Sequence, residues 1–306
     1  MAITGAGGFL GSRLGESLSA SASRLILWNR QESPLDSPAA WETAVKQADI
    51  IFHLAAQTSA AFANENPAQD YESNVAPALL LIEACKKLAR KPVVIFSGTV
   101  TQCGMPQTNP VDETHPEHPI TVYDVHKGEA EGHLLHASRQ GILQAISLRL
   151  PNLYGPGKNS SAPDRGILNQ IMRRALEGKE ILVYGSGEYS RDFLFIDDAV
   201  AALIMAAACA QELSGTYFIL SSGESITLLQ AFCKAAQQAE RLTGKPCTVK
   251  IDSSKPLQPI EQRNYAGNAA RFSQTTRWRA NTSIEEGIAK TLRYFQTNSL
   301  ELAAFS

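Results

Sequence analysis

The chain has 306 residues, of which 44% are hydrophobic and 19% charged, and its formal net charge is −2 at pH 7. The length suits one large globular domain or two closely packed ones. The balanced charge gives no footprint for a nucleic-acid partner, and the longest apolar run, residues 199–210, is too short to span a bilayer, so we expect neither nucleic acid nor a membrane as a partner.

Five scattered cysteines without a C-x-x-C pair predict reduced thiols and a cytoplasmic location; they are Cys85, Cys103, Cys209, Cys233 and Cys247. Glycines interrupt the first apolar stretch, so we expect no secretion signal. The histidines at positions 115, 118, 126, 133 and 136 lack the acidic or cysteine partners of a metal set, and we therefore expect no metal site.

Short apolar runs alternate with longer amphipathic stretches along the first 150 residues. The runs predict strands over residues 2–4, 25–28, 50–54, 93–96 and 145–149. The amphipathic stretches predict helices over residues 10–20, 39–47, 71–90 and 125–139. This alternation predicts an α/β fold, a doubly wound parallel sheet of the Rossmann type.

Two features of this first part are shorter than usual. Only three residues of the first strand precede Gly5, so either the strand is short or a few residues before it are missing. Residues 30–49 are too few for a complete helix–strand–helix unit. We therefore expect one strand at that edge of the sheet to be reduced or lost.

The pattern becomes irregular after Pro151 and then returns to alternation. It predicts strands over residues 193–196 and 217–220 and helices over residues 199–211, 228–242 and 283–297. We divide the chain accordingly into a nucleotide-binding domain, residues 1–150 with 191–221 returning to it, and a smaller α/β substrate lobe formed by residues 151–190 and 222–306.

A glycine-rich turn lies between the first strand and the first helix. Gly5, Gly8 and Gly11 form G-x-x-G-x-x-G, with Phe9 and Leu10 in the same turn. Glycines allow a tight turn and let the backbone approach a pyrophosphate at the helix N-terminus. An ordinary strand-to-helix turn is the alternative, but the position of this one at the start of the alternating pattern predicts nucleotide binding.

The end of the second strand bears on which dinucleotide would bind. An acid that grips the adenosine ribose 2′-hydroxyl is usual at this point, and here the residues are Asn29 and Arg30. Arg30, and Arg13 in the first helix, are suited to a 2′-phosphate, although both also read as solvated surface residues. We favour NADP(H) over NAD(H) on this ground.

The third strand ends in small residues, Leu54, Ala55 and Ala56, which let a flat cofactor pass close to the backbone. His53 precedes them, and we expect a buried, hydrogen-bonded histidine rather than a catalytic one. The fourth strand ends with the hydroxyls of Ser97 and Thr99. Such hydroxyls either bond the reacting oxygen or merely cap the strand end.

Tyr123 and Lys127 are spaced by four residues, so they lie one helical turn apart on the same face. The phenol is a candidate general acid or base, and the neighbouring ammonium favours its phenolate. Together with the glycine-rich turn, this pair predicts a nicotinamide enzyme that moves a proton and a hydride in one step.

These motifs together resemble the extended short-chain dehydrogenase/reductases, the NAD(P)-dependent nucleotide-sugar epimerase/dehydratase family, over nearly the whole chain. The matching segments are residues 4–11, 53–56, 74–75, 97–99, 123–127, 150–157 (LPNLYGPG) and 191–193 with 197–198 (RDF…DD). The last two segments are the most specific to the nucleotide-sugar branch. Residues 164–174 and 263–264 resemble its deoxysugar 4-ketoreductases more loosely.

The resemblance implies roles for individual residues. Tyr123 is the general acid/base, Lys127 holds the nicotinamide ribose and lowers the Tyr123 pKa, and Thr99 bonds the substrate oxygen. Asn152, Arg191 and Arg263 face the nucleotide-diphosphate sugar. The implied cofactor-binding residues are Gly5, Gly8, Phe9, Leu10, Gly11, Arg13, Asn29, Arg30, Leu54, Ala55, Ala56, Asn74, Ser97, Lys127 and Pro151. The helices over residues 71–90 and 125–139 would pair in a homodimer.

Some positions depart from the family pattern. Family 4,6-dehydratases carry an Asp-Glu pair directly after the catalytic threonine, whereas this chain has Val100 and Thr101, so we expect no dehydratase chemistry. Gly98 stands where serine is frequent, and Asn268 stands where an acid is usual.

Four functions remain open on these residues. A ketoreductase would reduce a 4-keto deoxysugar with NADPH, and the arginines favour it slightly. An epimerase would retain NAD and return the hydride to the other face of the sugar. A non-catalytic cofactor sensor would be expected to lose Tyr123 or Lys127, and a reductase of non-nucleotide ketones would not need Arg191.

Overall fold

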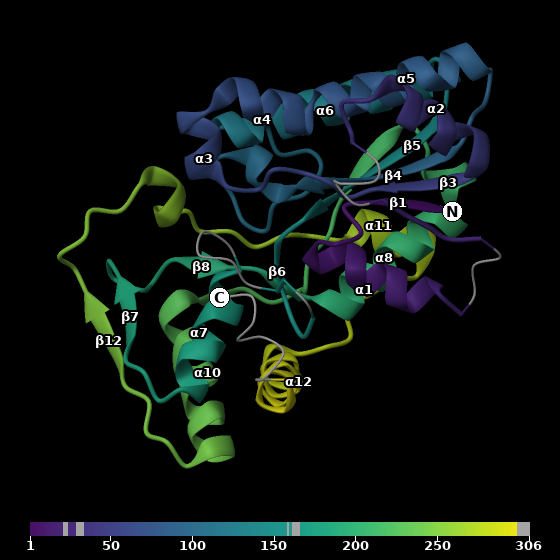
Figure 1. Cartoon of the computed structure of the whole chain (residues 1–306). Coiled ribbons are helices and arrows are strands. Elements are labelled where there is room, and N and C mark those ends of the chain that lie inside the picture. Colours follow the sequence, from purple (N-terminus) through teal and green to yellow (C-terminus); the bar gives the residue numbers. More distant parts are fainter. Residues whose placement is uncertain (21–23, 29–33, 158, 161–165, 299–306) are drawn as a thin grey trace.

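The computed structural model describes residues 1–20, 24–28, 34–157, 159–160 and 166–298. Six parallel strands form the central sheet in the order β10–β5–β4–β3–β1–β2 (Figure 1). This is the doubly wound arrangement predicted from the sequence. The six strands are β1 Ala2–Thr4, β2 Ile26–Trp28, β3 Ile50–His53, β4 Val93–Thr99, β5 Gln144–Leu150 and β10 Thr216–Ile219.

Helices cover both faces of this sheet (Figure 1). Alternate strand residues point to opposite faces, so Phe96 joins a core with Trp41 and Leu81, whereas Ile95 joins another core with Leu14. The first face carries α2 Pro38–Gln47, α3 Ala60–Glu65, α4 Pro67–Asn74, α5 Ala76–Leu88 and α6 Val122–Arg139, and the second carries α1 Phe9–Leu18, α8 Ile196–Ala208 and α11 Ala270–Thr276.

A third core joins the elements beside the sheet, with α7, α10 and α12 packed together around Met172, Phe232 and Ile288 (Figure 1). Three pairs of strands accompany them: β6 with β9, β7 with β12 and β8 with β11. The bounds are β6 Asn152–Tyr154, α7 Ile167–Leu176, β7 Ile181–Tyr184, β8 Ser190–Arg191, β9 Phe193–Phe195, α9 Ala210–Leu213, β11 Ile226–Thr227, α10 Leu228–Thr243, β12 Val249–Asp252 and α12 Ile284–Thr297, with 3₁₀ turns η1 Val100–Cys103 and η2 Pro259–Gln262.

The structure corrects two predicted helices. The helix expected over residues 71–90 is two helices, because Pro77 lies in the first turn of α5 and breaks the pattern after Asn74. The helix expected over residues 199–211 begins earlier, at Ile196, and is followed by the short helix α9. The reduced sheet edge was predicted correctly, since the described residues 34–49 hold α2 and no further strand.

Two simpler expectations can be compared with the fold. Within the described ranges, no helix combines the length and the apolarity needed to cross a bilayer. All five cysteines are free, with Cys85 and Cys103 buried.

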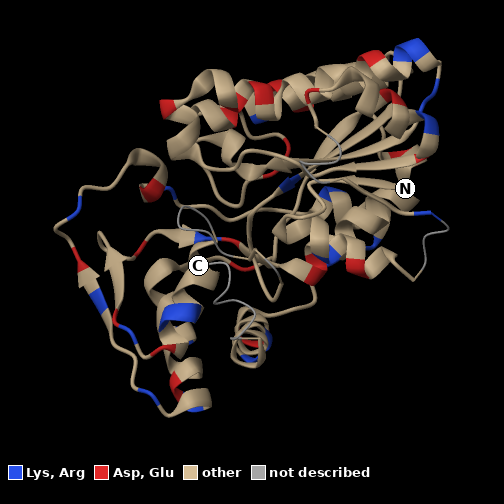
Figure 2. Cartoon of the chain, viewed as in Figure 1, with Lys and Arg blue, Asp and Glu red and all other residues tan. Residues whose placement is uncertain are grey.

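Acidic and basic residues are interspersed along the outer helices, and the sheet is nearly free of them (Figure 2). Arg149 of β5 is an exception, and it forms a buried ion pair with Glu131 of α6, with the Arg149 Nη2 to Glu131 Oε1 distance at 2.5 Å. Glu117 also pairs with Arg149, and Ser147 Oγ donates to Glu131 Oε2 at 2.6 Å. This cluster joins α6, which carries Tyr123, to the sheet.

We expect the Glu131→Gln substitution to lower the free energy of unfolding by about 3–5 kcal/mol, because it leaves the buried Arg149 cation only partly compensated. Urea denaturation followed by circular dichroism measures this loss. The matched control is Glu129→Gln on the same helix, a partly exposed site where the change should stay within about 0.5 kcal/mol. Equal losses in the two variants would contradict the role given to the cluster.

Candidate active site

The glycine-rich turn between β1 and α1 is packed against the end of β3. Gly5 has φ +69°, and a Cβ there would lie 2.8 Å from the Ala55 Cα. A Cβ on Gly11 would lie 2.2 Å from the Gly5 carbonyl oxygen, so only glycine fits at either position. Gly8 caps α1 without a side-chain hydrogen bond, and a Cβ on Gly7 would meet open space.

The predicted diphosphate site at this turn has two supporting features. No side chain caps the N-terminus of α1, where the helix carries a partial positive charge, and Gly7 faces open space beside the backbone. Helix α1 begins at Phe9, one residue before the expected start at Leu10, and the cofactor contacts expected of these two residues stay a prediction.

The ends of β1 and β3 are fastened together by hydrogen bonds. Thr4 Oγ1 accepts from the backbone nitrogens of Leu54 and Ala55 at 3.1 Å each and lies 2.9 Å from His53 Nδ1. His53 is 1% exposed, and burial lowers its pKa to about 3, so the ring is neutral. The prediction of a buried, hydrogen-bonded histidine is confirmed. Ser97 Oγ, on β4, donates to the His53 carbonyl at 3.4 Å.

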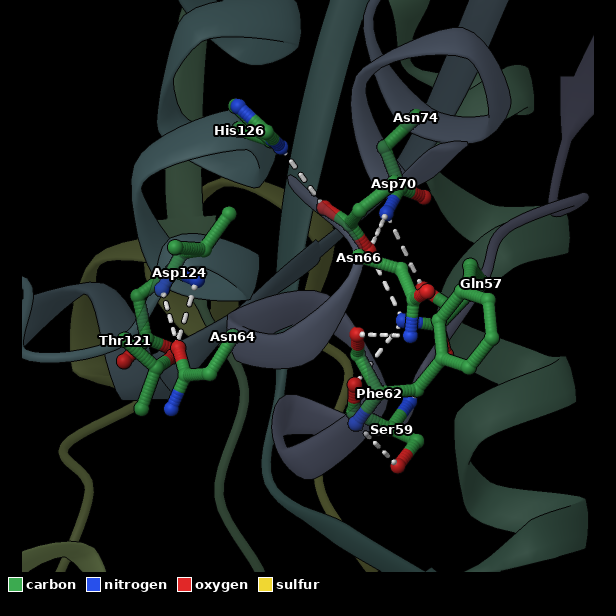
Figure 3. Close-up of polar contacts among 11 residues, drawn as sticks. Gln57, Ser59, Phe62, Asn64, Asn66, Asp70, Asn74, Thr121, Asp124 and His126 are labelled. Carbon is green, nitrogen blue, oxygen red and sulfur yellow. Dashed lines mark hydrogen bonds and ion pairs between the residues drawn. The ribbon is translucent and has the colours of Figure 1, made fainter. Parts of the chain in front are cut away.

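A buried carboxylate organises the loop that follows β3 (Figure 3). Asp70 of α4 is fully buried, and its Oδ1 accepts from Gln57 Nε2 at 2.7 Å and from Asn74 Nδ2 at 3.0 Å. Asn74 Nδ2 also donates to the Gln57 carbonyl at 3.1 Å. His126 of α6 points toward Asp70 and bonds its Oδ2 at 2.7 Å. Asn74 therefore supports this loop through its side-chain amide, and its predicted contact with the cofactor stays a prediction.

The first turns of α6 hold the predicted catalytic pair. Thr121 caps this helix by accepting from the Asp124 backbone nitrogen at 3.2 Å, and Asn64 accepts from Val122 nitrogen at 2.9 Å. Tyr123 is partly buried, whereas Lys127, one turn further, is 1% exposed. Both residues therefore lie in the first turns of α6, a helix end held by the Thr121 cap and by Asn64 of α3.

The Lys127 ammonium lies 4.0 Å from the centre of the Phe96 ring. Burial lowers the pKa of Lys127 from 10.5 to about 7, and the charges of Glu131 and Asp70 oppose this decrease. The side chain therefore exchanges its proton near neutral pH. A lysine with such a pKa, on a helix face shared with a tyrosine, is a candidate functional group.

Thr99 lies at the carboxyl end of β4 and is joined to α6 through the η1 turn. Its Oγ1 lies 2.8 Å from Thr101 Oγ1, and Thr101 in turn donates to Asp124 Oδ1. This chain of side chains holds Thr99 at the end of α6 that carries Tyr123. Gly98 is the residue that fits here, because a Cβ would lie 2.7 Å from Ser147 Oγ.

Two predicted substrate-binding arginines are buried near the same region, and they differ in what they bind. Arg191 donates to the backbone carbonyls of Glu261, at 2.8 Å, and of Arg263. Its neighbour Asp192 accepts instead from Ser221 Oγ at 2.6 Å. Arg191 thus supports the loop that carries Arg263.

Arg263 is 5% exposed, and its Nε and Nη1 make no hydrogen bond among the described residues. Burial lowers its pKa, and the nearby Cys103 and Asp124 oppose this effect. A buried guanidinium with unused donors is costly for the protein by itself and suits a ligand with phosphate oxygens. Of the two arginines, Arg263 has the free binding capacity.

The remaining predicted residues are less informative. Arg13 is held by carboxylates, with its Nε 2.7 Å from Asp197 Oδ1 and its Nη1 3.0 Å from Glu16 Oε2, which engages the donors a 2′-phosphate would need. Asn29 and Arg30 lie outside the described residues. Pro151 follows β5 in a buried position, and Asn152 begins β6, with its side chain 3.4 Å from the Asp192 carbonyl.

Sequence reasoning missed Asp70 and Asp124. Asp124 directly follows Tyr123, and an acid inside the Y-x-x-x-K motif was a signal that could have been read. Its carboxylate stands next to Thr101, one of the two positions where the family dehydratases carry acids. Asp70 had no comparable signal, because its partners come from three separate segments.

Comparison with known proteins gives matches that cover most of the chain. The model of the NAD dependent epimerase/dehydratase family matches residues 1–219, which include Tyr123, Lys127 and Thr99. UDP-glucose 4-epimerase of Mycolicibacterium smegmatis is 25% identical over 318 residues, covering 97% of this chain and 98% of that protein. dTDP-glucose 4,6-dehydratase of Xanthomonas campestris pv. campestris is 27% identical over 265 residues, covering 82% of this chain and 74% of that protein.

The fold is also found in solved structures. UDP-glucose 4-epimerase of Thermotoga maritima, determined with UDP-glucose, superimposes with a TM-score of 0.84 at 27% sequence identity, covering 97% of this chain and 99% of that chain. The Rossmann-like sheet predicted from the sequence is confirmed by this similarity and by the strand order.

Proposed function

Because the chain belongs to the NAD dependent epimerase/dehydratase family, we propose that it acts on a nucleotide-diphosphate sugar as a 4-epimerase, with Tyr123 as the general acid/base. The family match bears out the resemblance drawn from the motifs. The observation that carries the proposal is the joining of Thr99 to the helix end that bears Tyr123 and Lys127, through Thr101 and Asp124. Full-length similarity to UDP-glucose 4-epimerases supports the choice of reaction.

In the proposed reaction the chain's own residues handle the proton. Tyr123 accepts the proton of the sugar C4 hydroxyl as the carbon is oxidised and returns it when the ketone is reduced on the other face. Thr99 holds the reacting oxygen, and Lys127 provides a positive charge one turn from the phenol when it is protonated. NAD(P), which the glycine-rich turn of Gly5, Gly8 and Gly11 would hold, would supply the hydride chemistry. Arg263 binds the diphosphate, and Arg191 supports its loop.

Reduction of a 4-keto deoxysugar with NADPH is the second candidate, on the same residues. It was favoured above on Arg13 and Arg30. Arg13 is engaged by Asp197 and Glu16 and so gives no support for a 2′-phosphate, whereas Arg30 lies outside the described residues and its role stays a prediction. A non-catalytic sensor is disfavoured because Tyr123 and Lys127 are both present.

One experiment separates these functions. The purified protein is denatured, the released dinucleotide is identified by mass spectrometry, and the native protein is assayed with UDP-glucose and UDP-galactose without added cofactor. A 4-epimerase retains NAD and interconverts the two sugars. Release of NADP, no interconversion and NADPH consumption with a UDP-4-keto-6-deoxy sugar would establish the reductase instead. No turnover of either substrate would contradict both.

We expect Arg263→Gln to weaken the binding of UDP by about ten- to hundredfold, because charge-assisted hydrogen bonds to the diphosphate are lost. Calorimetry measures this affinity, and NAD(P) binding should not change. The control is Arg241→Gln, an exposed position on α10. An unchanged affinity for UDP in the Arg263 variant would show that the unused donors serve another purpose.

The division into two domains and the homodimer also remain proposals. The first is supported by the return of β10 to the sheet beside β5, as expected for residues 191–221. For the second, Tyr71 of α4 and Val125 of α6 are exposed large apolar side chains on the helices expected to pair. Light scattering of the purified protein tests the dimer.

A further inference from the structure

The carboxylate of Asp124 has no assigned role in the proposed reaction. It is 1% exposed, and its Oδ1 accepts from the Thr101 hydroxyl, which lies 2.8 Å from the hydroxyl of Thr99. Three side chains from η1, β4 and α6 thus form one hydrogen-bonded chain. Its outer end is Thr99, the residue proposed to hold the reacting oxygen.

Helix capping accounts for only part of the surroundings of this carboxylate. Thr121 caps α6 by accepting from the Asp124 backbone nitrogen, and Thr121 also hydrogen-bonds to the Asp124 carboxylate. The cap does not require the further bond from Thr101 to Asp124, and Asp124 Oδ2 is buried. The groups near the carboxylate are Arg263, on the loop after η2, and Cys103 of η1, a thiol whose pKa burial raises.

An ionised Asp124 fixes the direction in which the Thr101 and Thr99 hydroxyls donate their hydrogens. A carboxylate only accepts, and a hydroxyl has one hydrogen, so Thr101 must donate that hydrogen to Asp124. Thr99 must then donate its own hydrogen to Thr101, and the Thr101 backbone nitrogen also donates to Thr99 Oγ1 at 3.2 Å. Thr99 is left with a lone pair for the substrate. This suits a sugar hydroxyl that donates its one hydrogen to Thr99 in the complex with reduced cofactor, where Tyr123 is a neutral phenol and donates to the sugar oxygen.

Protonation of Asp124 permits the opposite direction. The acid then donates to Thr101, Thr101 donates to Thr99, and Thr99 directs its hydrogen outward, which suits a sugar ketone. The proton comes from solvent, and no bond of the substrate is made or broken by Asp124. We propose that Asp124 is a positioning residue that sets the direction of the Thr101–Thr99 hydroxyl chain, so that its ionised form favours the C4 alcohol and its protonated form favours the C4 ketone.

Burial raises the pKa of Asp124, and this effect is opposed by the hydrogen bonds from Thr101 and Thr121 and by the charge of Arg263. As pH rises through the titration of Asp124, the chain therefore changes from donating to accepting at Thr99. The inference rests on the proposed function, because it needs the substrate oxygen to lie at Thr99.

The test measures binding in complexes that do not react. UDP-glucose, a C4 alcohol, is bound to protein loaded with reduced cofactor, and UDP-4-keto-6-deoxyglucose is bound to protein loaded with oxidised cofactor. Calorimetry follows both affinities from acid to mildly alkaline pH. In the wild type, the ratio of ketone to alcohol affinity should fall about tenfold or more as pH rises, because one hydrogen bond changes from satisfied to unsatisfied.

Two variants interrupt the hydrogen-bonded series of Asp124, Thr101 and Thr99 at different points. Asp124→Asn removes the titrating group, and Thr101→Val removes the hydroxyl link while leaving the carboxylate. Both should lose the part of the pH dependence that Asp124 causes, and any trend left by the titration of Lys127 near pH 7 should be the same in the two variants. A wild-type pH dependence in Thr101→Val, or a flat ratio in the wild type, would overturn the inference. Failure of the wild type to bind either nucleotide sugar would contradict the proposed function instead.

Discussion

Replacement of Tyr123 by phenylalanine should lower turnover about 10²- to 10⁴-fold, because the phenol oxygen is the group proposed to move the C4 proton. The variant keeps the aromatic ring and the Lys127 side chain, so the affinities for cofactor and for UDP should be retained. Interconversion of UDP-glucose and UDP-galactose measures turnover, and calorimetry measures the two affinities.

The matched control is Tyr184→Phe, which removes the hydroxyl of an exposed tyrosine on β7. Its turnover should equal that of the wild type. If Tyr123→Phe also retained near-normal turnover, another group would have to move the proton, and the proposed mechanism would be wrong. A loss of UDP affinity in this variant would instead indicate a binding role for the phenol.

Local sequence patterns were enough to predict most of the fold. The six strands of the sheet were each predicted within a few residues, because their apolar runs end at glycines or polar residues. The split of the helix over residues 71–90 was readable from Pro77 and was missed. The short strands β6, β7, β8, β11 and β12 have two to four residues, and their pairing depends on distant segments rather than on a local pattern.

The candidate site was only partly predictable for the same reason. The burial of His53 was predicted correctly, because this residue ends an apolar run that reads as a buried strand. The partner of Arg13 is Asp197, which lies 184 positions away, and no local pattern announces such a contact. The link between Asp124 and Thr101 likewise depends on how η1 packs against α6. Motifs point to the candidate reacting residues, and the packing shows which contacts position them.

Substitution of Lys127 should change turnover and the free energy of unfolding in opposite directions. We expect Lys127→Met to abolish turnover and, in the cofactor-free protein, to raise the free energy of unfolding by about 1–4 kcal/mol at neutral pH. Burial lowers the pKa of Lys127 from 10.5 to about 7, which corresponds to a cost of roughly 4–5 kcal/mol at 1.36 kcal/mol per pKa unit. Methionine has a similar volume and no charge.

Removing this ammonium does not leave its neighbouring carboxylates without partners. Asp70 keeps its hydrogen bonds with Gln57, Asn74 and His126, and Glu131 keeps Arg149. The stabilisation should therefore appear in measurement and not be cancelled by a newly unpaired buried charge.

The gain in stability should depend on pH in a definite direction. Above pH 10.5 the lysine is neutral in both the folded and the unfolded chain, so its burial costs nothing. As pH falls toward 7, the unfolded chain takes up a proton that the folded protein does not, and the cost grows. The advantage of Lys127→Met should thus be largest at about pH 7 and below, and should shrink as pH rises.

Urea denaturation of the cofactor-free proteins over this pH range measures the effect. Lys91→Met, at an exposed position, is the control and should change stability by no more than about 0.5 kcal/mol, without a pH trend. A Lys127 variant that is less stable than the wild type at neutral pH would show that the ammonium is a structural ion-pair partner. Higher stability together with lost turnover would show that the buried lysine at position 127 lowers the stability of the fold and is required for the reaction.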